Sequence, residues 1–233
     1  MHAIARLTED VLHLFYPHLC LGCGNDVLAK NQVICSFCYH DLPRTNYANI
    51  KNNPIEKLFV GRLPIHAAHS EFYFSKGKLV QQLIHQIKYH AHLDLGTYLG
   101  KLMGSSLFQS NRFQNIDAIV PLPMFADKEK KRGYNQAAVI ANGIAETLGV
   151  PVVEKLVIRS RATSSQTNKH RIERWQNVED SFQIASSNFF ENKHILLVDD
   201  VLTTGATLEA CGMAILQIPQ VTISIATLAM ANS

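Results

Sequence analysis

Two adjacent carboxylates and the small loop after them are the residues of this chain that most directly suggest chemistry. Asp199 and Asp200 end an apolar run, and the loop TTGAT occupies 203–207 before a helix-like stretch. Small residues let a ligand approach the backbone closely. The N–H groups of such a loop and of a helix start favour an anion such as phosphate. The two acids would repel phosphate but could hold hydroxyl groups or a metal ion, so a ribose 5-phosphate satisfies both halves.

An ordinary loop and two known nucleotide-binding motifs are the other interpretations of this stretch. An ordinary βα loop, with an Asp or Thr capping the helix, is the structural alternative. A Walker loop is excluded, because no Gly-Lys-Ser/Thr follows, and the Gly-x-Gly-x-x-Gly pattern of dinucleotide-binding proteins is absent. The residue types therefore favour phosphate binding without naming the ligand.

Four cysteines form a second constellation, in the pairs CLGC and CSFC. Their spacing brings four thiolates together, which is the ligand set of a closed structural Zn²⁺ site. Such a site leaves no open position for a substrate, so we expect a structural role. Disulfides, a redox-active dithiol and an iron–sulfur cluster are the alternatives, and the absence of an export signal argues against disulfides. The predicted ligands are Cys20, Cys23, Cys35 and Cys38.

Basic residues gather in two places although the net charge of the 233-residue chain is only +3. The window 155–174 holds six basic residues and one acidic residue. A second basic cluster, KEKKR, lies earlier in the chain at 128–132. An anionic partner fits this distribution, whereas a solvated surface is the plainer interpretation. Within the window, Arg171 and Arg174 are three residues apart and would share one face of a helical turn.

Alternating strands and helices must position these residues. Apolar patterns predict helices over 1–16, 79–87, 95–103, 136–148 and 208–218, and strands over 69–75, 116–123, 150–158, 194–200 and 220–229. This order predicts an α/β fold with a mostly parallel sheet flanked by helices, in which ligands bind beyond the carboxyl ends of the strands. The Asn- and Pro-rich segment 44–57 predicts a linker between a helix-plus-cysteine module (1–43) and a larger domain (58–233).

Composition places the chain among ordinary globular proteins. Apolar residues make up 47% and charged residues 18% of the sequence, which argues against wholesale disorder. The apolar runs are shorter than the roughly 20 residues of a membrane helix. The charged N-terminal stretch does not resemble a secretory signal. We therefore expect a cytoplasmic protein without an integral membrane segment.

A family resemblance extends this interpretation. ILLVDDVLTTGATL resembles the phosphoribosyl pyrophosphate (PRPP) motif of type I phosphoribosyltransferases. The chain is also similar to the ComF family, called the competence or GntX-like family. The similar stretches are IKYHAHLDLGTYLGKLM, PLPMFADKEKKRGYNQAAVIANGIAETLGVP, RATSSQTNKHRIERWQNVEDSF and the four-cysteine module.

The resemblance implies a role for each matching residue. The paired acids contact the ribose hydroxyls, and the loop, which comprises Thr203, Thr204, Gly205, Ala206 and Thr207, holds the 5-phosphate. Mg²⁺ accompanies PRPP, and the basic segment 160–180, with Arg171 and Arg174, is a candidate lid over the pyrophosphate. The resemblance also marks Lys88, Arg132, Asn135 and Gln136 as PRPP-binding candidates. Each has a structural alternative: Lys88 as a surface residue, Asn135 as the cap of the helix over 136–148.

Two hypotheses of different class remain open from the sequence. The first is a phosphoribosyltransferase that acts on an unidentified base or nucleotide and is linked to DNA uptake. The second is a non-catalytic module that binds PRPP and single-stranded DNA, together with the competence machinery. Basic residues serve pyrophosphate and a nucleic-acid backbone equally well, and aromatic residues among them are few.

Overall fold

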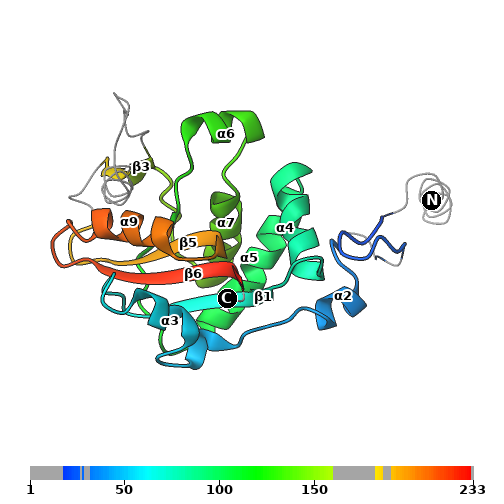
Figure 1. Cartoon of the computed structure of the whole chain (residues 1–233), viewed down its shortest axis with the longest axis horizontal. Coiled ribbons are helices and arrows are strands. Elements are labelled where there is room, and N and C mark those ends of the chain that lie inside the picture. Colours follow the sequence, from blue (N-terminus) through cyan, green and yellow to red (C-terminus); the bar gives the residue numbers. More distant parts are fainter. Residues whose placement is uncertain (1–17, 27, 29–31, 160–181, 186–189, 232–233) are drawn as a thin grey trace, which may run out of the picture.

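A four-stranded parallel sheet forms the centre of the computed structural model of this chain. The structure describes residues 18–26, 28, 32–159, 182–185 and 190–231, so the predicted helix over 1–16 lies outside it. The parallel pairing confirms the predicted α/β class. In spatial order (Figure 1) the strands are β1 (Ala68–Phe74), β6 (Thr222–Ala231), β5 (His194–Leu202) and β2 (Ala118–Pro121).

Helices cover the sheet through two separate apolar cores. Successive residues of a strand point to opposite faces. On β5, Leu196 and Val198 therefore join one core, whereas Ile195 and Leu197 join the other. Burial on both faces explains why the strand is apolar throughout. The first core is covered by α4 (Leu79–Tyr89), α5 (Leu93–Phe108) and α7 (Gln136–Leu148), and the second by α3 (Pro54–Phe59) and α9 (Ala206–Ile215).

Helices α5 and α7 pack with their backbones in contact. A Cβ atom at Gly143 would lie 2.2 Å, and one at Gly100 2.3 Å, from a carbonyl oxygen of the facing helix. Asn135 caps the start of α7, and Gly149 ends the helix in the left-handed conformation that the sequence predicts. The close packing therefore fixes the N-terminus of α7 relative to the sheet.

Three short elements lie outside the four-stranded sheet. Helix α6 (Ala126–Arg132) follows β2, and β3 (Val157–Arg159) pairs with β4 (Phe182–Ile184) in a separate two-stranded antiparallel sheet. The strand predicted over 150–158 is interrupted by a turn at the exposed Glu154 and Lys155. None of the described helices combines the length and apolar character needed to cross a bilayer.

The segment 44–57, predicted as a linker, is folded onto β1. Arg44 forms an antiparallel bridge with Phe72, and η1 (Tyr47–Asn49) follows. Asn53 is 1% exposed; its Oδ1 atom caps α3, and its Nδ2 atom donates to a carbonyl oxygen of β1 at 2.8 Å. The asparagines and proline here form caps and turns, so this part of the chain is not a flexible spacer. The boundaries of the two domains stay a prediction.

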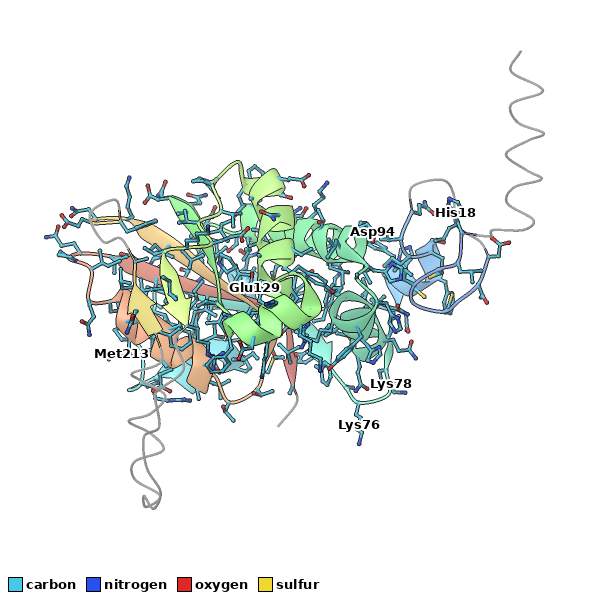
Figure 2. The ribbon with its side chains drawn as sticks, turned by 90° about the horizontal axis from the view of Figure 1, so that it is seen from above. His18, Lys76, Lys78, Asp94, Glu129 and Met213 are labelled. Atoms are coloured by element: carbon cyan, nitrogen blue, oxygen red, sulfur yellow. The ribbon has the colours of Figure 1, made fainter. Side chains whose placement is uncertain are left out.

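The cysteine module (18–43) lies beside α4 and α5, on the side of the molecule away from α9 (Figure 1). It contains the short helix α2 (Ser36–His40). Ile34 and Leu42 of the module belong to the same apolar core as α4 and α5. Figure 2 shows Asp94, at the start of α5, on the side that faces the module, where His18 is marked.

Candidate functional site

The two carboxylates lie near the carboxyl end of β5 in different surroundings. Asp200 is buried, and its Oδ2 atom lies 2.7 Å from Nζ of Lys88 in the last turn of α4. Asp199 is partly exposed, and its Oδ1 atom accepts a hydrogen bond from the backbone N–H of Asp200 at 2.8 Å. Burial, and then the charge of Asp200, raise the pKa of Asp199 to about 8. The pair would be stabilised by a cation or by hydroxyl donors.

The loop after the acids leads directly into α9. Gly205 is the N-cap of this helix with φ of 75°, so the cap residue has no side-chain acceptor for the first N–H groups. Thr203 and Thr204 are exposed. Arg62 holds the loop against α9, since it donates to the carbonyl oxygen of Thr204 at 3.0 Å and to the carboxylate of Glu209 at 3.1 Å. Ala206 N donates to Thr204 Oγ1 at the long distance of 3.5 Å, so the start of this ten-residue helix can still turn N–H groups toward an anion beside the acidic pair.

A basic groove adjoins the acidic pair on the α4 side. It encloses a volume of about 310 Å³, and Lys88 belongs to both the groove and the Asp200 ion pair. The guanidinium of Arg132 lies 5.9 Å from the ring centroid of Tyr89. The lining residues, called the basic groove below, are Lys88, Tyr89, Ala91, Lys128, Lys131, Arg132 and Tyr134.

The other predicted binding residues occupy the start of α7. Asn135 accepts a hydrogen bond from Ala137 N at 3.0 Å and donates to the carbonyl oxygen of Leu122 at 3.0 Å, so both ends of its amide are engaged within the protein. Gln136 accepts a hydrogen bond from Arg132. Asn135 is therefore the N-cap of α7 in this structure, which is the structural alternative that the sequence offers for this residue. Arg171 and Arg174 lie outside the described residues.

Arg159 is a residue of this region that sequence reasoning treated only as part of a basic window. Its guanidinium lies 4.1 Å from the ring centroid of Phe125 and 5.1 Å from that of Phe182. Burial lowers the pKa of Arg159, while the charge of Asp199 opposes this shift. No local sequence signal reveals the arrangement, because the three residues come from separate parts of the chain.

The four predicted cysteine ligands come together in the N-terminal module. Their Sγ atoms all lie within 4.8 Å of one another, and Sγ of Cys23 lies 3.8 Å from Sγ of Cys35. A Zn–S distance of about 2.3 Å implies tetrahedral S–S edges of about 3.8 Å. Backbone N–H groups also donate to the sulfurs of Cys20 at 3.2 Å and Cys35 at 3.4 Å. The donor set and its geometry fit a structural Zn²⁺ ion.

Comparison with known protein families gives this arrangement a context. Residues 134–233 match the family described as "Phosphoribosyl transferase domain". Over these residues the chain is similar to the phosphoribosyl transferase family. This match includes the acidic pair, the 203–207 loop and the start of α7. The predicted resemblance to type I phosphoribosyltransferases is confirmed at this level.

Individual relatives agree with the resemblance to the competence family. The chain is 26% identical to Competence protein F of Haemophilus influenzae over 83% of this chain and 89% of that protein. It is 26% identical to DNA utilization protein YhgH of Escherichia coli over 58% of this chain and 60% of that protein, which is less than two thirds of its length. A solved adenine phosphoribosyltransferase is 16% identical with a TM-score of 0.38, over 62% of this chain and 72% of that one. The stretch that matches the phosphoribosyl transferase family thus lies in a chain that is similar to competence and DNA-utilization proteins.

Proposed function

We propose that this chain binds PRPP together with Mg²⁺ and transfers the phosphoribosyl group to a base or nucleotide acceptor. One observation carries the proposal: an acidic pair, of which Asp200 is buried, lies next to a helix start whose cap residue is glycine, in the stretch that matches the phosphoribosyl transferase family. A ligand with a diol and a phosphate matches these two neighbouring features. The similarity to the phosphoribosyl transferase family supports this reaction class, whereas the acceptor is left open.

Each part of the site has a role in this proposal. Asp199 and Asp200 hold the ribose hydroxyls, and the loop 203–207 holds the 5-phosphate through N–H groups and threonine hydroxyls. Mg²⁺, when bound with PRPP, supplies positive charge to the diphosphate oxygens. The basic groove adds fixed cations near the leaving diphosphate, which favours the charge that develops during transfer. Lys88 links these parts because it contacts Asp200 and lines the groove.

Equilibrium titration with PRPP and Mg²⁺ tests the binding step. We expect Asp199→Asn and Asp200→Asn each to weaken PRPP binding by at least about tenfold, because each removes a carboxyl group that would accept hydrogen bonds from the ribose hydroxyls. Asp117→Asn is the matched control, since Asp117 pairs with Lys193 at the amino end of β5. Failure of the unaltered protein to bind PRPP would refute the proposal.

Transfer is tested separately from binding. Pyrophosphate release from PRPP should be followed across a panel of purines, pyrimidines and nucleotides, with Asp199→Asn as the inactive reference. Release that depends on one acceptor supports the enzyme hypothesis. PRPP binding without release for any acceptor supports the non-catalytic alternative.

Single-stranded DNA is a second candidate ligand, favoured by the surface of the basic groove. Tyr89 is 66% exposed at the edge of the groove, next to lysines of α6. Cations that follow a phosphate backbone and an exposed aromatic ring on which a base can stack are the usual features of single-strand binding. We expect affinity for an oligonucleotide to fall steeply with salt and to weaken in Tyr89→Ala. Undetectable binding at low salt contradicts this second function.

Zinc binding by the cysteine module is part of the same proposal, with 1–43 as the metal-binding domain and 58–233 as the transferase domain. Four thiolates in a closed set suit a structural ion. Metal analysis of the purified protein should find about one zinc per chain, as expected for one four-thiolate site. A zinc-free protein that is equally folded would contradict this assignment.

A further inference from the structure

The 203–207 loop is supported by a segment from a distant part of the sequence. Residues 58–63 end α3 and turn toward β1, so they lie outside the stretch 134–233 that matches the phosphoribosyl transferase family. The backbone N–H groups of Arg62 and Leu63 both donate to the carbonyl oxygen of Phe59 at 3.0 Å, which closes the turn. The side chains of this turn are therefore held in fixed directions.

Two apolar side chains of the turn pack directly on the loop and on α9. A Cβ atom at Gly205 would lie 3.1 Å from Cε1 and Cζ of Phe59, and one at Gly212 would lie 2.6 Å from Cδ2 of Leu63. Phe59 and Leu63 are almost fully buried in the core that α9 covers. Arg62 lies between them in the sequence, so its backbone is fixed relative to the loop.

The guanidinium of Arg62 joins three parts of the structure. Its Nη1 atom donates to the carbonyl oxygens of Leu58 and Thr204, each at 3.0 Å. Its Nε atom donates to Oε2 of Glu209, in the first turn of α9, at 3.1 Å. Because the donors of a guanidinium form a rigid planar fork, these bonds fix the loop relative to both helices.

The bond to Thr204 also determines the direction of an N–H group in the loop. The peptide bonds of the described residues are trans, and in a planar trans peptide the C=O and N–H groups point in opposite directions. A donor on the carbonyl oxygen of Thr204 therefore turns the N–H of Gly205 away from Arg62. The same side chain pairs with Glu209, whose charge opposes an anion near the start of α9.

We propose that Arg62 is a positioning residue for the 5-phosphate of the ligand, because it orients the Thr204–Gly205 peptide for N–H contact with the phosphate. Arg62 acts through the backbone of the loop and does not itself bind the ligand. The inference rests on the proposed function, since it concerns the same 203–207 loop. An ion pair with a purely structural role would stabilise the fold without discriminating among ligands.

Three ligands separate positioning from a general loss of structure. Ribose 5-phosphate and PRPP carry the 5-phosphate, whereas pyrophosphate lacks it. With Mg²⁺ present, we expect Arg62→Met to weaken binding of the first two about tenfold and that of pyrophosphate less than about twofold. Arg62→Lys should show a smaller loss with the same selectivity, since one ammonium group can still donate to the carbonyl oxygen of Thr204. It provides the test if Arg62→Met does not fold.

Arg112→Met is the matched control. The side chain of Arg112 donates to Glu56 of α3 at 2.6 Å and to the carbonyl oxygen of Ile50 at 2.8 Å, so it too joins an ion pair to a backbone contact. We expect this variant to lower the temperature of thermal unfolding while all three affinities stay within about twofold of the unaltered protein.

The outcomes are distinct from those of the proposed function. Equal weakening of all three ligands by Arg62→Met, or ribose 5-phosphate binding within about twofold of the unaltered protein, overturns the inference. Glu209→Gln keeps a side-chain oxygen for Arg62, so a loss of ribose 5-phosphate affinity as large as in Arg62→Met would assign the effect to the ion pair and also overturn it. If the unaltered protein binds ribose 5-phosphate but not PRPP, the proposed function fails while the ribose 5-phosphate titration still decides the role of Arg62.

Discussion

Replacement of Asp199 by asparagine is expected to stabilise the ligand-free protein, by an amount that grows with pH. Burial, and then the charge of Asp200, raise the pKa of Asp199 from 3.8 to about 8. A carboxyl group with a raised pKa in the folded state holds its proton more tightly there. Its contribution to stability is therefore complete below the unfolded pKa and is lost as the pH rises toward the folded pKa. Asparagine has no proton to lose, so the variant escapes this penalty.

The magnitude follows from the size of the shift. One pKa unit corresponds to about 1.4 kcal/mol. The full shift would therefore increase the difference in unfolding free energy between Asp199→Asn and the unaltered protein by about 4 kcal/mol between about pH 5 and pH 8. Because Asp199 is partly exposed, solvent screens part of this energy. We therefore expect the asparagine variant to gain about 2 kcal/mol over the unaltered protein across this interval, in the free energy of unfolding.

Urea unfolding of both proteins at several pH values, without Mg²⁺ or a phosphoribosyl ligand, measures the gap directly. Asp117→Asn is an informative control, because a backbone hydrogen bond from His194 lowers the pKa of Asp117. Its effect should have the opposite sign: the variant is less stable near neutral pH and approaches the unaltered protein as the pH falls. A gap for Asp199→Asn that stays constant within about 0.5 kcal/mol across the range would refute the reasoning.

Three further perturbations test other parts of the structure. Lys88→Met should lower the free energy of unfolding by about 2 to 4 kcal/mol near pH 8, because it leaves the buried Asp200 without its cation; a loss below that of Lys88→Arg contradicts a structural ion pair. Gly143→Ala should cost about 1 to 3 kcal/mol in urea unfolding, since backbone atoms of α5 occupy the space for a methyl group; the exposed Ser105→Ala is the control, and an unchanged midpoint argues against close helix packing. Cys23→Ser should abolish stoichiometric zinc and lower the temperature of thermal unfolding; retained zinc would point to other ligands.

Much of the fold and part of the candidate site follow from local sequence signals. The apolar run before Asp199 predicts a buried strand with acids near its carboxyl end, and β5 has this form. Gly149 ends α7 where the apolar pattern stops. The spacing of the cysteines predicts four converging sulfurs, and they converge. In each case the residues that act together are close in the sequence or belong to one repeating pattern.

Features that depend on tertiary contacts are those that the sequence does not reveal. Arg159 carries no local mark of a stacked cation, because its partners Phe125 and Phe182 are brought to it by the sheet. The segment 44–57 has the composition of a linker, yet Asn53 uses its amide to cap α3 and to bind β1. Asparagine and proline favour turns and helix starts as well as flexible loops, so composition alone does not separate a spacer from a packed connection.

The shared core of the cysteine module and α4 has a practical consequence for solubility. Gly22 lies so close to Leu79 that a Cβ atom there would be 2.8 Å from its Cδ1 atom, and Ile34 and Leu42 pack into the same core. A chain shortened to begin after residue 43 would expose the apolar face that these residues cover. Such a patch promotes aggregation. If the module holds zinc as proposed, removal of the metal would uncover the same face, so zinc-depleted preparations should precipitate even though the cysteines lie far from the acidic pair in sequence.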